Sequence, residues 1–311
     1  NLGCMTIDPR TVQRVAKVLS GGGPPLPQAR AKATVRDLRT QAMRAPHLVS
    51  KITGLTEAAK QAAKVEVLVV DRASWAGAAA VSIEAMLPPE DNPIGTAELS
   101  LVLSAVAPRI LGQFDPYTSD EGRLYLIAPN VASFRQNYDL DRRDLSLWVA
   151  VHELTHAVQF AAAPWLTQTI LDHARTIMSL SDTPADTADT EATEETTAEE
   201  HFERITAIMS LLEGHAEYVM NNVPRQRMPG RDRIIEAMAD RRSNKNPLVA
   251  FISNRMGMTA KVKQYTGGEK FVEGVIDRAG MDVFNRVWER AEHLPTAADI
   301  NDPAAWIERV S

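Results

Sequence analysis

The segment Asp144–Phe160 (DLSLWVAVHELTHAVQF) constrains the fold more than any other part of the sequence. Its apolar positions recur at helical spacing, and Pro164 ends the pattern, so the segment predicts one buried helix. His152 and His156 lie four residues apart, which places both rings on one helix face. Two such rings can bind one Zn²⁺ at about 2.0–2.1 Å. The fold must therefore build a helix with a metal-binding face.

Glu153 stands between these histidines in the pattern H-E-x-x-H. It lies about 100° around the helix from His152, so it is badly placed as a ligand but can reach a metal-bound water. That is the position of a general base in a metallohydrolase. The competing interpretation is a helix that carries two histidines by chance. The short predicted strand Arg123–Ala128, shortly before the helix, favours the metal site.

The third ligand is expected on the next long helix, His201–Asn221, because a catalytic zinc takes three protein ligands and one open position. Glu213 and Glu217 share one face of this helix. We assign Glu213 as the ligand and Glu217 as the acceptor of a histidine N–H. Four apolar neighbours predict that Glu213 is shielded from solvent: Ile208, Met209, Leu211 and Leu212.

Two alternatives stay open on this helix. His215 is a rival third ligand, although it points roughly 160–200° away from both carboxylates. Glu213 and Glu217 could also form an ordinary solvated face. Tyr218 is a possible stabiliser of the transition state. Gly214 would allow another helix to approach closely.

The rest of the chain predicts a mainly α (α+β) fold with a small sheet beside the histidine helix. The strands are Val65–Asp71 and Arg123–Ala128. The other helices before the acidic segment are expected over residues 11–19, 28–42, 47–64, 74–86, 97–112 and 166–180, and the one over 97–112 is expected to be interrupted or to end near Pro108. We expect one domain over 1–311, built from 1–143, the metal-site helices 144–221 and a helical part 222–311.

Ser181–Glu200 holds eight acids and no base, and its composition predicts a mobile, solvated spacer. Removing these acids from the net charge of −6 leaves the other residues at +2, so no broad basic footprint for nucleic acid is expected. The single cysteine, Cys4, excludes an intrachain disulfide. With no long apolar run and no signal-peptide pattern in Asn1–Thr11, we expect a cytoplasmic protein without a membrane partner.

Several segments together resemble an actinobacterial family of zincin-like hydrolases that is labelled as associated with deazaflavin-coenzyme biosynthesis. The segments include LGQFDPY (Leu111–Tyr117), RLYLIAPN (Arg123–Asn130), WVAVHELTHAVQFAAAPWL (Trp148–Leu166) and MSLLEGHAEYVMN (Met209–Asn221). The resemblance implies a mostly helical zincin-like metallopeptidase fold in a cytosolic bacterial protein. It also implies a metal site at His152, His156 and the EGHAE segment, with Glu153 as base.

The function expected from these patterns is zinc-dependent hydrolysis of a peptide or small amide, with a gluzincin-like site. The alternative is a catalytically inactive zincin-fold protein that serves as a binding or scaffold protein in coenzyme biosynthesis. Glu153 favours the hydrolase, because a site that only binds has no need of a base.

Overall fold

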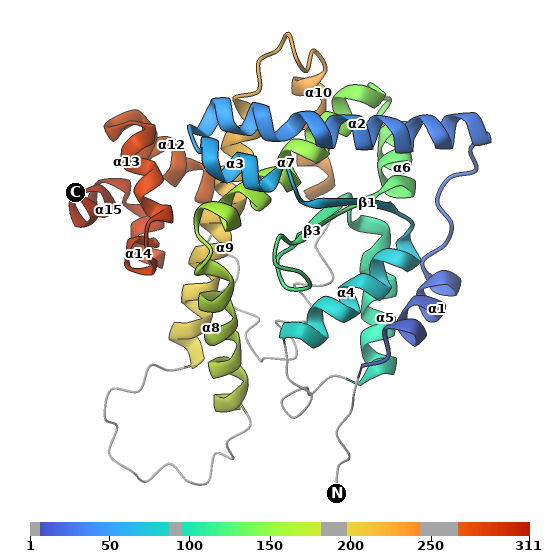
Figure 1. The fold of residues 1–311 in the computed structure, drawn as a ribbon, viewed down its shortest axis with the longest axis horizontal. Helices are drawn as coiled ribbons and strands as arrows, with labels where there is room; N and C mark the ends of the chain where they lie inside the picture. The colour runs from blue at the N-terminus through green and yellow to red at the C-terminus, as the bar shows by residue number, and fades with distance from the viewer. Residues whose placement is uncertain (1–6, 87–94, 182–197, 243–266) are drawn as a thin grey trace, which may run out of the picture. The chain divides into compact units, whose positions relative to one another are not determined.

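The computed structural model describes residues 7–86, 95–181, 198–242 and 267–311 (Figure 1). The chain divides into two compact units. The larger unit comprises Asn1–Ala162 and Ala216–Arg255, and the smaller unit comprises Ala163–His215 and Met256–Ser311. The single domain expected over 1–311 stays a prediction.

The larger unit contains a three-stranded mixed sheet among helices. Strand β1 (Glu66–Val70) pairs in parallel with β3 (Arg123–Ile127), and β3 pairs in the antiparallel sense with β2 (Gly112–Asp115). The helices of this unit are α1 (Pro9–Leu19), α2 (Gln28–Thr53), α3 (Thr56–Ala62), α4 (Arg72–Met86), α5 (Thr96–Val106), α6 (Ala128–Tyr138), α7 (Arg142–Ala162) and α10 (Arg231–Arg242). The predicted class, mainly helical with a small sheet, is confirmed.

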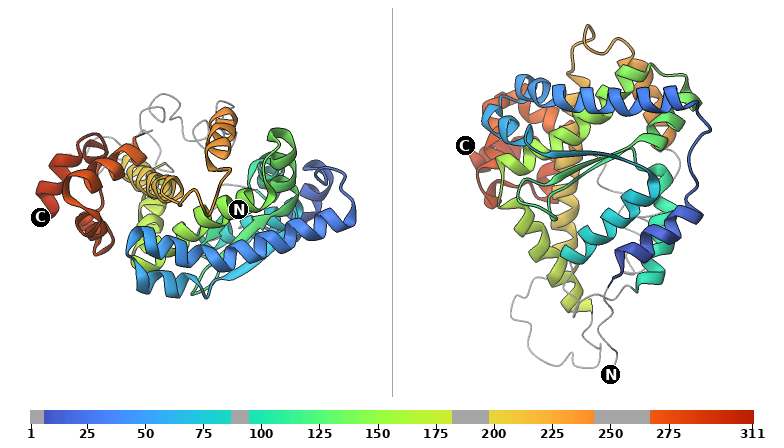
Figure 2. Two further views of the ribbon diagram at one scale, coloured as in Figure 1. Left: turned by 90° about the horizontal axis from the view of Figure 1, so that it is seen from above. Right: turned by 45° about the vertical axis from the view of Figure 1, so that its right-hand side comes forward.

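The sheet lies between two helical layers. Alternate residues of a strand point to opposite faces, and in β3 the side chains on both faces are buried. On β3, Leu124 and Leu126 join the core formed with α2 and α7. Tyr125 and Ile127 join a second core formed with α1, α4 and α5. Figures 1 and 2 show α2 on one side of the sheet and α1, α4 and α5 on the other. This arrangement holds α7 against the sheet.

One predicted boundary on the N-terminal side is wrong. Residues 28–42 and 47–64 were expected as separate helices, but α2 runs unbroken from Gln28 to Thr53 through Pro46. Pro46 is buried in the packed face of α2, and tertiary packing there outweighs its helix-breaking tendency. The helix expected over 97–112 is interrupted near Pro108 as predicted: α5 stops at Val106, a 3-10 turn covers Ala107–Arg109, and the chain enters β2 at Gly112.

The smaller unit is helical in its described residues. Its elements are α8 (Leu166–Ser181), α9 (Ala198–Asn221, which continues into the larger unit from Ala216), α12 (Gly268–Ala279), α13 (Met281–Asn285), the 3-10 turns Arg286–Trp288 and Ala291–His293, α14 (Ala297–Asn301) and α15 (Pro303–Val310). The close helix approach expected at Gly214 is confirmed, because a Cβ there would stand 2.1 Å from the backbone carbon of Gly268.

The acidic spacer expected over 181–200 is shorter than predicted. Helix α8 includes Ser181, and α9 already begins at Ala198, so Ala198–Glu200 are helical. Two of these residues are glutamates in the first turn, where the helix dipole favours negative charge. Residues 182–197 lie outside the described residues. None of the described helices combines the length and the apolar character that crossing a membrane requires.

Candidate metal centre

Helix α7 places His152 and His156 as the spacing predicts. Most of the helix is buried in the core, while both histidines are half-buried. Their rings meet edge to face with centroids 4.8 Å apart, and the two Nε2 atoms are 3.2 Å apart. Two nitrogens bound to one tetrahedral zinc at about 2.05 Å stand about 3.3 Å apart. The pair therefore has nearly the spacing that a shared ion requires.

Gln159 fixes the orientation of one of these rings. Nδ1 of His156 lies 2.9 Å from Oε1 of Gln159, and the Gln159 side chain is fully buried. Because an amide oxygen only accepts hydrogen bonds, Nδ1 carries the proton and Nε2 presents its lone pair. The sequence pattern predicted Glu217 in this supporting role, and Gln159 was not predicted. The spacing of three residues on one helix was the signal that could have found it.

Glu153 is buried against strand β2. Its Oε2 accepts a hydrogen bond from the backbone N–H of Phe114 at 3.1 Å. Gly112 supplies the space for this contact: a Cβ at that position would stand 2.6 Å from Cγ and 2.8 Å from Oε1 of Glu153. Strand β2, which the sequence analysis did not predict, therefore holds the candidate base.

Strand β2 is itself anchored at its end. The buried carboxylate of Asp115 accepts hydrogen bonds from the Ser82 hydroxyl (3.0 Å), the Tyr117 N–H (2.9 Å) and the Thr118 hydroxyl (2.7 Å). Burial, and then the nearby Asp115, raise the pKa of Tyr117 to about 12. The strand that supports Glu153 is thus fixed by a polar network outside the candidate centre.

A carboxylate joins the two histidines in the structure. Ligand atoms of His152, His156 and Glu213 all lie within 4.8 Å of one another. Two imidazoles and one carboxylate match the set of three protein ligands found in catalytic zinc sites, so these residues fit the metal.

The expectation that Glu213 is shielded is wrong, because its side chain is exposed. Leu211 and Leu212 turn into the core, whereas Glu213 shares the solvent face with Met209, one turn earlier, which is 43% exposed.

The other predicted residues of α9 lie outside this group of three. His215 is fully buried, and the centroid of its ring lies 5.1 Å from that of Phe284 and 5.4 Å from that of Trp288. Glu217 is half-buried, and the half-buried Tyr218 packs against the core of the larger unit. The roles assigned to these three residues stay predictions.

The family of the chain follows from a match over residues 92–307 to a model described as zincin-like metallopeptidase. The chain belongs to this family. This zincin-like chain is also similar to a solved structure from Chloroflexus aurantiacus, described as "a putative hydrolase with a novel fold". The two share 28% sequence identity over 97% of this chain and 98% of the other, with a TM-score of 0.70. No curated protein matches in sequence. The actinobacterial origin and the link to a deazaflavin coenzyme stay predictions.

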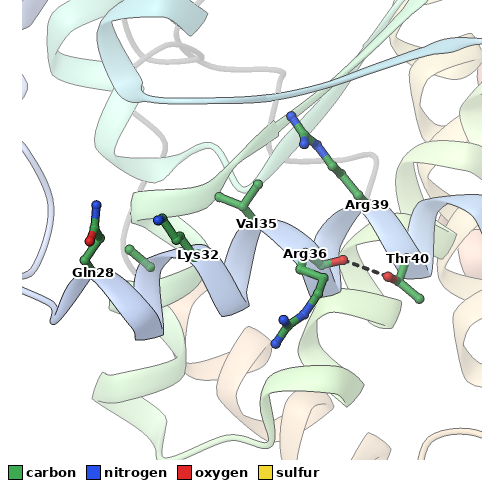
Figure 3. Close-up of a pocket in the computed structure, with 7 residues that line it drawn as sticks. Gln28, Lys32, Val35, Arg36, Arg39 and Thr40 are labelled. Atoms are coloured by element: carbon green, nitrogen blue, oxygen red, sulfur yellow. Dashed lines mark hydrogen bonds between the residues drawn. The ribbon is translucent and has the colours of Figure 1, made fainter.

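Figure 3 shows a groove on the surface of this zincin-like chain, and none of the predicted site residues lines it. All of its lining residues belong to α2, and three of them are cations: Lys32, Arg36 and Arg39. Thr40 donates a hydrogen bond to the carbonyl of Arg36, as Figure 3 shows. Because a single helix forms the groove, it has no opposing wall that would select a ligand.

Proposed function

We propose that the chain is a zinc-dependent hydrolase, most simply a metallopeptidase that cleaves a peptide or small amide. The observation that carries the proposal is the convergence of ligand atoms from His152, His156 and Glu213, with Glu153 one residue from His152. Membership of the zincin-like metallopeptidase family and the similarity to a described hydrolase support it.

In this proposal His152, His156 and Glu213 hold the zinc, which when bound polarises the scissile carbonyl and acidifies water. Gln159 keeps the Nε2 lone pair of His156 directed at the metal position.

Glu153 accepts the proton of the attacking water and returns it to the leaving amine. The Phe114 N–H keeps one oxygen of the Glu153 carboxylate in place, so the carboxylate does not have to be ordered when substrate binds. Tyr218 is proposed as a further hydrogen-bond donor to the developing oxyanion.

Glu153→Gln tests the proposal, because the amide keeps the shape of the side chain but cannot accept the proton. After dialysis against metal-free buffer, we expect about one tightly bound zinc per chain in both the wild type and the variant, as in a mononuclear catalytic site. We expect hydrolysis of a quenched peptide library to fall about 100- to 10,000-fold in the variant. Glu57→Gln, at an exposed glutamate of α3, is the matched control and should retain full activity.

The outcomes separate the hydrolase from the alternative. Zinc in the wild type without turnover of any peptide would support the inactive binding or scaffold protein. Loss of zinc in Glu153→Gln would make Glu153 a ligand and overturn its role as base. A wild type that binds no zinc would overturn both the site and the function.

A further inference from the structure

Two histidine rings also meet at a second place in the chain, within the smaller unit. His173 of α8 and His201 of α9 face each other with Nδ1 atoms 2.8 Å apart. The ring centroids are 4.9 Å apart, and the ring planes cross at 64°. Both side chains are half-buried. The figures show α8 and α9 side by side along this stretch (Figures 1 and 2).

This arrangement resembles the pair on α7, where the Nε2 atoms are 3.2 Å apart and the centroids 4.8 Å apart. In each pair two ring nitrogens converge on one point, where a proton or a metal ion can bridge them.

The remaining three histidines of the chain are placed differently. His47 is exposed on α2, and His215 packs among aromatic rings. His293 accepts a hydrogen bond from Nε of Arg290, and its other ring nitrogen contacts a backbone carbonyl.

We propose that His173 and His201 form a second metal site, which binds a divalent transition-metal ion such as Zn²⁺ through their two Nδ1 atoms. Water completes the coordination. The site is separate from the first one, because His201 and Glu213 are twelve residues apart on α9, or about 18 Å along the helix.

The donor set selects the class of metal. Imidazole nitrogen suits Zn²⁺, Cu²⁺ and Ni²⁺, whereas Mg²⁺ and Ca²⁺ require oxygen ligands. Within the described part of the chain, no third histidine, cysteine or carboxylate forms a three-residue cluster with this pair. The described residues thus supply two protein ligands, and such a site should bind zinc more weakly than the three-ligand site. A tetrahedral ion needs the Nδ1 atoms about 0.5 Å further apart, which small side-chain rotations supply.

The neighbouring charges act in both directions. Asp172, next to His173, favours a cation, and Arg204, one turn after His201, opposes it. Burial, followed by the charges of His201 and Arg204, lowers the pKa of His173.

Zinc stoichiometry tests the second site. Metal-free wild-type protein, titrated with Zn²⁺, should bind about two ions per chain, the second more weakly than the first. His173→Ala and His201→Ala should each lose the weaker ion and keep the tighter one. His47→Ala is the matched control and should keep both ions. A wild type that binds only one ion, or a His173→Ala variant that still binds two, would overturn the proposal.

A measurement on the wild type alone covers the case in which the variants fail to fold. Protein preloaded with one equivalent of Zn²⁺ is treated with diethyl pyrocarbonate, with and without further Zn²⁺. At a zinc concentration ten times the weaker Kd, carbethoxylation of His173 and His201 should slow about tenfold, because only the unoccupied fraction reacts. His47 should react at an unchanged rate. Equal rates at His173 with and without the added zinc would refute the site.

Discussion

Gly112→Ala is the change that most directly tests how the structure holds Glu153. The new Cβ would stand 2.6 Å from Cγ, 2.8 Å from Oε1 and 2.9 Å from Cδ of Glu153. Gly112 does not have a positive φ, so alanine strains no left-handed backbone there. The predicted effect therefore comes from the side-chain contact alone.

The magnitude follows from overpacking and from the displaced hydrogen bond. Forcing an extra carbon into a filled site costs about 1–3 kcal/mol. If the carboxylate also loses the Phe114 N–H, a further ~1.5 kcal/mol is expected, because the bond involves a charged group. Together the two contributions give an expected loss of roughly 2.5–4.5 kcal/mol in the free energy of unfolding.

The assay is a double-mutant cycle by urea unfolding of metal-free protein. Glu153→Ala removes Cγ, Cδ and Oε1, so Gly112→Ala should cost little in that background, and the coupling should be close to the whole loss of roughly 2.5–4.5 kcal/mol. Gly22→Ala is the matched control: its Cβ would meet nothing within 4 Å, so a change below about 0.5 kcal/mol is expected.

The result that refutes this reasoning is an equal cost of Gly112→Ala with and without the Glu153 side chain. A neutral Gly112→Ala in the wild type would refute it as well. Hydrolysis and zinc content of Gly112→Ala provide a second check. Displacement of the Glu153 carboxylate should lower hydrolysis, whereas the zinc content should stay unchanged because His152 and His156 still bind the metal.

Three further predictions concern other contacts. Gly214→Ala would place a Cβ 2.1 Å from the backbone of Gly268, so it should unfold the smaller unit or strongly lower the thermal midpoint of that unit in calorimetry. An unchanged midpoint would contradict the close helix approach. Gln159→Leu removes the acceptor of the His156 N–H and should weaken zinc binding about 10- to 100-fold in competition with a chromophoric chelator. Since burial raises the pKa of Tyr117 to about 12, the folded state retains a proton that the unfolded state loses near pH 10, so stability falls as pH rises between these values. Tyr117→Phe should remove roughly 1.9 kcal/mol of that loss between pH 10 and pH 12 in urea unfolding. An unchanged difference would show that Tyr117 is not the group responsible.

Local patterns were enough to predict helix α7 and the shared face of His152 and His156. Both follow from the helical period, which depends only on residues three and four apart. The strands β1 and β3 were likewise readable, because their runs of β-branched and apolar residues suit a buried sheet. The position of Glu153 on the helix was readable in the same way, but its contacts were not.

Tertiary structure alone decided the surroundings of these residues. Strand β2 has the sequence GQFD, with too little β-propensity to be recognised, and it exists because β3 offers it a hydrogen-bonding edge. Helix α2 continues through Pro46 because its buried face packs on α7.

The contact of Gly112 with Glu153 joins residues 41 positions apart, and the pairing of His173 with His201 joins residues 28 apart. No local period encodes such contacts, since the side chains meet only after helices and strands have packed.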